Sequence, residues 1–310
     1  MFRKVRRIAK QLYDGCYNAI FNPVCGYVIM LHRIGSIEPE RLDVIEELKV
    51  SEERLQRFVD AKRKKYDFIS LDELYRRMKG EHVNQRPFIC FTFDDGFKDN
   101  VTLGLPFFEK NRIPFSVFVT TDFINRKPAF NYPFLLENIV RHNDLIRIGE
   151  DTYFCKSREE KERTFLKLKE MVLGLSYEVF ETSFNSLFKD YLRPEYYEDL
   201  MMTWDDVRML AESPLCTLGS HTVSHCRLSM ASNQGLVDEL EKSKRQIEQI
   251  VNQKIEYISY PFGWHTDVND CVVHSTRESG YKMGFISHGG AVRKKDIDCF
   301  RIKRMMLKEN

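Results

Sequence analysis

The stretch FICFTFDDGFKDN, Phe88–Asn100, places two neighbouring aspartates, Asp94 and Asp95, at the end of an apolar run. Successive residues of a strand point to opposite faces, so both carboxylates can reach one pocket only where the strand ends and the backbone turns. Gly96 permits such a turn. A solvated loop between a strand and a helix is the other interpretation, and the rest of the chain has to decide between them.

Outward from this stretch, short apolar or β-branched runs alternate with segments of helical periodicity. The runs that predict strands are Tyr27–Leu31, Asp67–Ser70, Phe88–Phe93, Phe115–Thr120, Thr217–Ser220, Glu256–Tyr260, Lys282–Ser287 and Phe300–Met305. The segments that predict helices are Leu71–Met78, Thr203–Ala211, Gln234–Val251 and Val268–Ser279. This alternation indicates an α/β protein with a mostly parallel sheet and crossovers. About seven or eight such units favour a (β/α) barrel, in which chemistry lies at the carboxyl ends of the strands.

The composition sets the class of protein. The chain has 310 residues, 43% of them apolar, and its 48 basic and 46 acidic residues leave a net charge of +2. That length gives ample core for one large domain, which we assign to residues 23–310. No basic stripe with interleaved aromatic residues, helix-turn-helix signal or zinc-knuckle spacing occurs, so no nucleic-acid partner is expected. Residues 130–202 do not continue the alternation of strands and helices. They predict a helical insertion that caps the barrel or forms an oligomer contact.

Residues 1–22 carry a separate signal. Five basic residues precede the first acid, Asp14, and apolar residues recur at helical spacing. We expect a basic amphipathic helix that rests on an anionic membrane surface or packs on the domain. The eight cysteines are scattered without a C-x-x-C pair, which in a chain of this length favours reduced thiols over a disulfide framework. The expected location is therefore cytoplasmic, with peripheral contact at the inner membrane face through this helix.

Two histidines four residues apart in LGSHTVSHCRL, His221 and His225, form a second constellation. On a helical turn this spacing puts both imidazoles on one face, as a divalent metal requires, although histidine pairs also occur on solvated faces. Gly219 and Ser220 mark the end of a strand, and Asp95 offers a third ligand. Two imidazoles and one carboxylate with an open position form a catalytic metal set, because structural zinc sites usually close with cysteine.

Two further motifs follow predicted strands. In YISYPFGWH, Pro261 and Gly263 fix a tight turn. Such a turn either aims a backbone N–H, that of Phe262, at a developing oxyanion or is simply a turn. In VIMLHRIG, His32 directly follows an apolar run. A histidine there is often a hydrogen-bonded rim residue, but its place at a strand end makes it the best general-acid candidate.

The motifs FTFDDG, SHTVSH and YPFG, in this order and separation, resemble those of the polysaccharide deacetylase (NodB-homology) family of carbohydrate esterases. The resemblance covers Tyr27 to about Leu307, apart from the helical insertion. It implies a distorted (β/α) barrel and metal-dependent removal of acetyl groups from N-acetylated sugars. By the same resemblance, Asp94 is the catalytic base, and Asp95 and the two histidines of SHTVSH are the metal ligands.

The chain departs from the family pattern at two points. An arginine that orients the base usually stands two residues before the proline of the third motif, and here that position is Ser259. We expect Arg301 or Arg304, in the basic run FRIKRMML, to supply the cation from another strand. The general-acid histidine of many members lies in a late Leu-x-His motif, which that run lacks. MLHRIG resembles a rearranged form with the acid near the N-terminus, so we assign the acid to His32 rather than His288.

The resemblance also implies a divalent metal, most simply Zn²⁺ with Co²⁺ or Ni²⁺ as alternatives, and an N-acetylated sugar polymer or glycolipid as the substrate. Reduced cysteines and a surface helix favour a lipid-linked or nucleotide-linked precursor, or a glycan made on the inner membrane face. Two other functions stay open. One is a carbohydrate-binding pseudoenzyme, which the missing motif arginine favours, and the other is a hydrolase of the same fold that acts on another non-peptide C–N bond.

Overall fold

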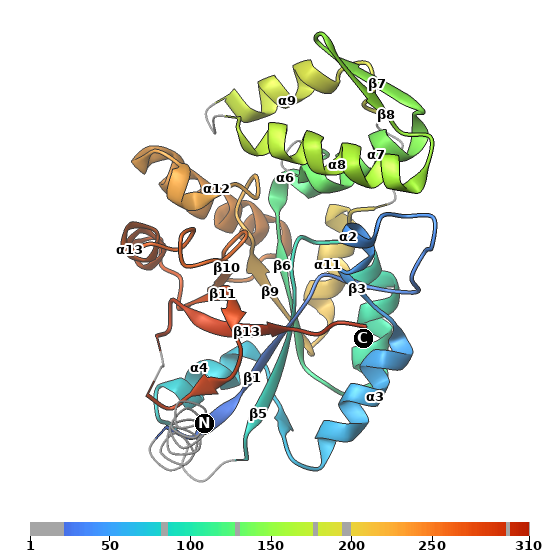
Figure 1. Cartoon of the computed structure of the whole chain (residues 1–310). Coiled ribbons are helices and arrows are strands. Elements are labelled where there is room, and N and C mark those ends of the chain that lie inside the picture. The colour runs from blue at the N-terminus through green and yellow to red at the C-terminus, as the bar shows by residue number, and fades with distance from the viewer. Residues whose placement is uncertain are drawn as a thin grey trace, which may run out of the picture.

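Seven parallel strands close into a barrel in the computed structural model, which describes residues 22–81, 86–127, 131–175, 179–193, 200–295 and 298–309 (Figure 1). The strands, in order around the ring, are β1 (Val24–Leu31), β5 (Phe88–Phe93), β6 (Phe115–Val119), β9 (Cys216–Ser220), β10 (Tyr257–Ser259), β11 (Met283–Gly289) and β13 (Ile302–Met306). The ring closes because β1 pairs with both β5 and β13. The predicted barrel of about seven strands is confirmed, and each of its strands was placed to within three residues at either end.

The register of the barrel strands sets the level at which the chain leaves them. The last residues of β1 and β5 lie opposite each other, so His32 and Asp94 follow at the same height. Two short strands extend the sheet, β12 (Val292–Arg293) antiparallel to β1 and β4 (Asp67–Phe68) parallel to β5. The other short elements are β2 (Arg33–Ile34), α2 (Asp43–Glu46), β3 (Lys49–Val50), the π-helical turn η1 (Asn100–Gly104) and the 3-10 turn η4 (Leu228–Met230).

The residues of β5 alternate between the two sides of the barrel wall. Phe91 and Phe93 pack in the outer core against the helices, whereas Phe88 and Cys90 belong to a separate apolar cluster inside the barrel. A parallel strand buried on both faces reads as a continuous apolar run, which explains FICFTF. Continued by one step, the same alternation directs Asp94 inward.

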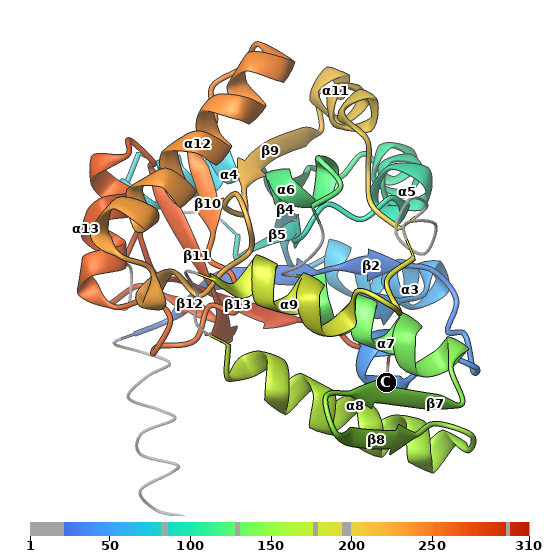
Figure 2. The same ribbon diagram turned by 90° about the horizontal axis from the view of Figure 1, so that it is seen from above.

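Helices surround the barrel (Figure 2). They are α3 (Glu52–Arg63), α5 (Leu105–Asn111), α11 (Trp204–Glu212), α12 (Asn233–Val251) and α13 (Asp270–Glu278). α4 (Leu71–Met78) instead covers the amino-terminal end of the barrel, where Leu71 and Leu74 join the apolar cluster of Phe88. The four helices predicted from the sequence, α4, α11, α12 and α13, all form, with ends within two residues of the prediction. Their starts have a local cause, because a side chain accepts a hydrogen bond from a first-turn N–H at Ser70, Thr203, Ser232 and Asn269.

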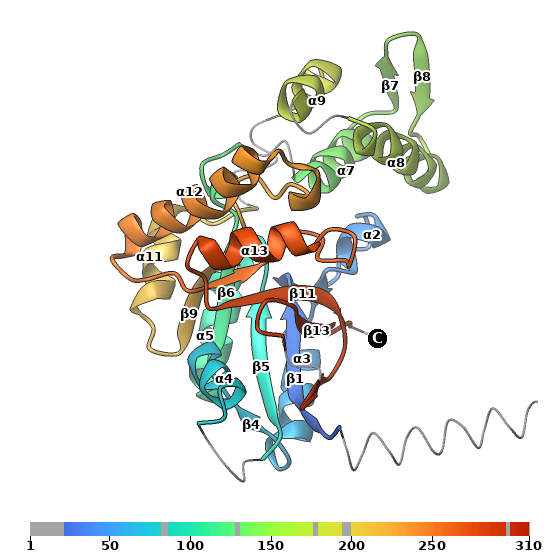
Figure 3. The same cartoon turned by 90° about the vertical axis from the view of Figure 1, so that its left-hand side faces the viewer.

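The segment between β6 and α11 stands over the carboxyl ends of the barrel strands (Figure 1 and Figure 3). Its elements are α6 (Thr121–Ile124), α7 (Tyr132–His142), β7 (Leu145–Ile148), β8 (Asp151–Phe154), α8 (Arg158–Leu173) and α9 (Phe180–Phe188). The predicted insertion is therefore mostly helical, but it also holds an antiparallel hairpin, β7–β8, that its composition did not indicate. A buried ion pair between Arg41 and Glu137, 2.8 Å from Nη2 to Oε2, joins the insertion to the loop after β2.

Three expectations concern the ends of the chain and the cysteines. The helix predicted for residues 1–22 lies, apart from Asn22, outside the described residues. Among the helices that the structure describes, none is both long and apolar enough to cross a membrane. The seven cysteines other than Cys16 form no disulfide bond.

Candidate active site

Polar side chains converge where the barrel strands end beneath the insertion. Asp94 and Asp95 follow β5, His221 follows β9, His32 follows β1, and the turn Pro261–Gly263 comes shortly after β10. Both aspartates and His221 are buried. The closed ring therefore gathers residues from four separate parts of the sequence into one site.

Asp95, His221 and His225 form a compact group whose ligand atoms all lie within 4.8 Å of one another. The Oδ1 atom of Asp95 lies 3.3 Å from the Nε2 atom of each histidine. Yet this oxygen is buried and has no hydrogen-bond donor in the described part of the chain. Burial alone would raise the pKa of Asp95, but the two imidazoles hold it well below its usual range. The result is an ionised carboxylate and two ring nitrogens around one point.

This donor set fits a divalent metal ion. Zinc binds imidazole nitrogen and carboxylate oxygen at about 2.0–2.2 Å, so two ligands at a tetrahedral angle are separated by about 3.4 Å. The observed 3.3 Å separations match that value. The tautomer of His221 is also suitable: its Nδ1–H donates to the Ser259 carbonyl at 2.7 Å, so the lone pair of Nε2 faces Asp95. We therefore identify these three residues as the candidate metal ligands.

The loop that carries the histidines is not a helical turn, so that part of the prediction is wrong. Thr222 and His225 have left-handed backbone conformations, with φ of 68° and 65°, and these bends bring the two imidazoles to the same point. The carboxylate of Glu239 on α12 stabilises the loop. It accepts hydrogen bonds from the N–H groups of Val223 and Ser224, both at 2.9 Å. Glu239 is buried, so the loop is anchored from behind.

Neighbouring aspartates point to different partners because the backbone reverses between them. Asp94 continues the inward alternation of β5, whereas Asp95 has a φ of 75°, outside the range of a strand. Non-glycine residues in this region cost on the order of 1–3 kcal/mol and cluster at functional sites. Asp94 thereby enters the barrel, and Asp95 turns toward the histidines.

Asp94 is held by a two-point ion pair with Arg304 from β13. The Nη1 and Nη2 atoms of the guanidinium donate to Oδ1 and Oδ2 at 2.8 Å and 2.6 Å. Ser259 lies between the partners: its hydroxyl donates to Asp94 at 3.1 Å and accepts from Arg304 at 2.8 Å. Burial would raise the pKa of Asp94, but the Arg304 charge holds that pKa below its usual value.

Of the two arginines considered from the sequence, only Arg304 reaches Asp94. Arg301 lies at the surface, where it pairs with Asp270 at 2.5 Å and Asp298 at 3.3 Å. Arg301 precedes β13, whereas Arg304 lies within the strand, where it is buried two positions after the buried Ile302 and so shares its inward face.

The two histidines considered as general acid lie in different surroundings. Burial lowers the pKa of His32 below its usual value, and the charges of Asp95 and Asp94 oppose this effect only in part. Its Nδ1 atom is buried without a hydrogen-bond partner in the described residues. His288 instead donates its Nδ1–H to the Gly263 carbonyl at 3.0 Å and stacks on Trp264. It lines a separate cavity with His265.

The YPFG turn folds against the metal-ligand group. Phe262 and Gly263 both have positive φ, 60° and 65°, and a Cβ atom at Gly263 would lie 2.6 Å from the backbone nitrogen of Ser287. Only glycine fits there. The Phe262 ring packs 5.1 Å from the His225 ring, between centroids, so the predicted oxyanion turn, Pro261–Gly263, is beside the candidate metal ligands.

The roles of several residues that shape the site were missed in the sequence. Ser259 and Glu239 are described above, and the other two, Asp99 and Asn100, stand three and four positions after the end of FTFDDG. Asn100 donates to the His32 carbonyl at 2.9 Å, and Asp99 accepts from the Ile34 N–H at 3.2 Å. Together they position the end of β1. The sequence did carry a sign of this role, since both are polar residues at the end of the stretch FICFTFDDGFKDN.

Comparisons with known proteins identify the family and the fold. The family model described as Polysaccharide deacetylase matches residues 82–284, and no curated protein matches the chain. Among solved structures, the Streptococcus pyogenes deacetylase PplD, in complex with acetate, aligns with a TM-score of 0.61 at 18% identity, over 92% of this chain and 93% of that chain. IcaB from Ammonifex degensii aligns with a TM-score of 0.59 at 14% identity, over 92% of each chain. The BpsB deacetylase domain from Bordetella bronchiseptica gives 0.55 and 16%, over 91% of this chain and 95% of that chain. At these identities the structural likeness shows a shared fold.

Proposed function

The chain belongs to the polysaccharide deacetylase family, and on that premise we propose that it is a metal-dependent hydrolase that removes acetyl groups from N-acetylated sugars of a polysaccharide or glycan precursor. One observation carries the proposal. The buried Oδ1 atom of Asp95 faces the Nε2 atoms of His221 and His225 at 3.3 Å and has no hydrogen-bond donor in the described residues. A buried acceptor left unpaired costs about 1–3 kcal/mol, and more when it is charged, so a cation at this point would relieve the cost.

Asp95, His221 and His225 would hold the metal and leave a position open for substrate. When bound, a divalent ion polarises the acetamide carbonyl and lowers the pKa of water. Two imidazoles and a carboxylate suit Zn²⁺, and Co²⁺ or Ni²⁺ also accept these ligands.

Asp94 is the proposed general base. It accepts a proton from the attacking water, and it is available for this because Arg304 keeps it ionised and fixes both of its oxygens. With its carboxylate held at two points, Asp94 needs no reorientation when the reaction begins.

Two other groups would stabilise the developing oxyanion and protonate the leaving amine. The N–H of Phe262 would donate to the developing oxyanion, as a left-handed turn beside the metal ligands allows. His32 would donate a proton to the departing amine, which is a poor leaving group without one. We prefer His32 to His288, because His288 is engaged with Gly263 and Trp264.

The pairing of Asp94 with Arg304 also supports turnover over a purely carbohydrate-binding role. The absence of the motif arginine at Ser259 was the main reason to consider a pseudoenzyme. Here a guanidinium from β13 makes two hydrogen bonds to the base, and the small Ser259 side chain leaves room for it.

Acetate release from N-acetylglucosamine oligomers tests the proposal. The protein is stripped with a chelator and assayed before and after addition of Zn²⁺ or Co²⁺, with Asp94→Asn as the matched variant. We expect release only with metal and only from the unmodified protein. If metal binds and no acetate appears, the protein is a binding module; release from other acylated amines but not from sugars would assign it to another C–N hydrolase class.

A further inference from the structure

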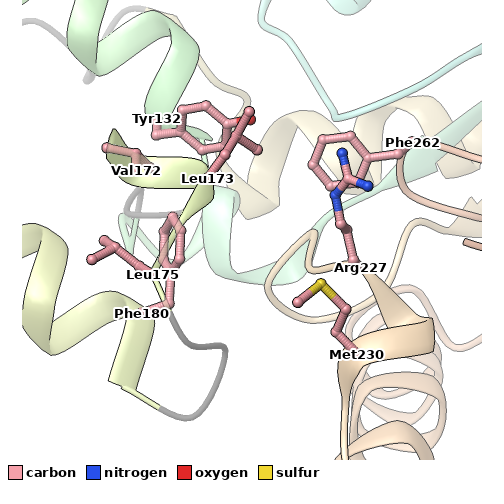
Figure 4. A pocket seen from close by; sticks show the side chains of 8 residues that line it. All are labelled: Tyr132, Val172, Leu173, Leu175, Phe180, Arg227, Met230 and Phe262. Carbon is pink, nitrogen blue, oxygen red and sulfur yellow. The ribbon is translucent and has the colours of Figure 1, made fainter. Parts of the chain in front are cut away.

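An apolar cleft of about 290 Å³ opens between the insertion and the barrel, next to the candidate active site. Figure 4 shows the insertion side chains on one side of it and the barrel side chains on the other. The lining residues are Tyr132, Val172, Leu173, Leu175 and Phe180 from the insertion, and Arg227, Met230 and Phe262 from the barrel loops. The volume is near the lower end of small-molecule sites, about 300–1,000 Å³, so the cleft suits one part of a larger ligand.

A continuous series of contacts leads from the metal-ligand group to this cleft. The His225 imidazole, one of the candidate ligands, has its ring centroid 5.1 Å from that of Phe262. The Arg227 guanidinium carbon lies 4.7 Å from the same ring centroid. Phe262 and Arg227 both line the cleft opposite the apolar side chains of the insertion. The cleft therefore has an aromatic ring, a cation and an apolar wall beside the candidate metal ligands.

The cation in this series is held in place. Arg227 Nη1 donates to Asp267 Oδ1 at 3.2 Å, and the Asp267 side chain is only 2% exposed. The Arg227 side chain remains 38% exposed. A guanidinium fixed at one end by a buried carboxylate, with its remainder open to the cleft, is suited to bind an anion such as a phosphate.

The insertion wall has the wrong chemistry for sugar rings. Among the lining residues, only Arg227 and Tyr132 have polar side-chain groups able to form hydrogen bonds, whereas a buried sugar needs partners for several hydroxyl groups. Leu173 and Met230 nevertheless face the cleft while 45% and 55% exposed. Large apolar side chains gathered at the mouth of a cleft indicate an apolar ligand.

We propose that this cleft binds the hydrocarbon chain of a lipid-linked substrate whose N-acetylated sugar is joined to the lipid through a phosphate, and that Arg227 binds the phosphate. The proposal rests on the proposed deacetylase function, because the acetamide is to lie at the candidate metal ligands. It goes beyond that function by naming an amphiphile as the substrate. Such a substrate agrees with the cytoplasmic, membrane-peripheral location that the sequence predicts and that stays a prediction.

Two synthetic esters of N-acetylglucosamine 1-phosphate test the proposal, one with a dodecyl and one with a methyl group, both used below the micelle-forming concentration. With metal-loaded full-length protein, we expect kcat/KM for the dodecyl ester to exceed that for the methyl ester by about tenfold or more, because each buried methylene favours binding. Leu173→Asp should reduce this ratio to near one. Leu166→Asp is the matched control, since Leu166 is on the same helix, is 61% exposed and does not line the cleft. Arg227→Gln should weaken binding of both phosphate esters.

Calorimetric titration with the dodecyl ester gives a readout that does not need turnover. If the ester binds more weakly to Leu173→Asp but not to Leu166→Asp, the result supports binding of the hydrocarbon chain in the cleft. If, in addition, no substrate releases acetate, only the deacetylase function is refuted. If both esters release acetate at equal kcat/KM, the deacetylase function stands and the lipid proposal is overturned. Equal losses in the two leucine variants would overturn it as well.

Discussion

The ion pair between Arg304 and Asp94 allows a sharp prediction about stability. The guanidinium donates five hydrogen bonds, one to the Ile286 carbonyl, one to Thr92, two to Asp94 and one to Ser259. The side chains of Arg304 and Asp94 are 0% and 3% exposed. Arg304→Met keeps much of the volume but leaves a buried carboxylate without its cation. Removing one partner of a buried pair costs about 3–5 kcal/mol, a large share of a typical total stability of about 5–15 kcal/mol.

The loss should depend on pH in a defined direction. In the unmodified protein the pKa of Asp94 is held below its usual value, so the pair adds stability above the unfolded pKa of about 3.9 and loses it as the pH falls through the folded pKa. In Arg304→Met the burial remains and the cation is gone, so the pKa of Asp94 rises above the unfolded value. The variant then gains stability as the pH falls. The difference between the two proteins is therefore largest at neutral pH and shrinks toward pH of about 4.

Urea unfolding of the metal-free protein, followed between acid and neutral pH, measures both effects. Arg301→Met is the matched control, because Arg301 is 33% exposed and its partner Asp270 is 99% exposed. Such a surface pair contributes about 0–1 kcal/mol. The reasoning would be refuted if the two variants lost equal stability, or if the deficit of Arg304→Met grew as the pH fell.

Three further predictions concern the reaction. Asp95→Asn should lower Zn²⁺ affinity by more than about 100-fold, because loss of a residue that only hydrogen-bonds to a ligand already costs about 10–100-fold. Competition with a chelating dye measures the affinity, and an unchanged value would exclude Asp95 as a ligand. Asp94→Asn should keep Zn²⁺ and lower kcat by about 10²–10⁴-fold, so near-normal turnover would remove Asp94 as the base. His32→Gln should lower kcat on N-acetylated sugars by about 10²–10⁴-fold but spare 4-nitrophenyl acetate, whose leaving group needs no proton. His288→Gln should spare both substrates, and the reverse pattern would exchange the two roles.

Much of the fold could be predicted because its signals are local. Phe88–Phe93 is a strand with the predicted ends, since a parallel strand buried on both faces is written as an unbroken apolar run. α4 begins after Ser70, whose side chain accepts a hydrogen bond from the Glu73 N–H. The carboxyl ends of parallel strands meet at one end of a barrel, so Asp94 and His221, each at the end of a predicted strand, could be expected to meet.

Other features were missed or could not be predicted. The hairpin β7–β8 was missed because residues 130–202 were predicted to be helical as a whole, although two short strands flank a turn at Gly149. The HTVSH segment carries histidines at helical spacing but is a loop, because Glu239 on α12 binds its backbone N–H groups. A short polar segment has no strong preference of its own, so the tertiary partner decides its conformation.

The sequence by itself determined which residue types stand at the strand ends, and with them the family, the candidate ligands and the candidate base. It left open which cation pairs with Asp94, since Arg304 is 210 residues away and sequence separation does not tell which strands become neighbours. Only closure of the ring, with β1 between β5 and β13, brings Arg304 to Asp94. The same holds for the apolar cleft, whose two walls come from the insertion and from loops that follow β9 and β10.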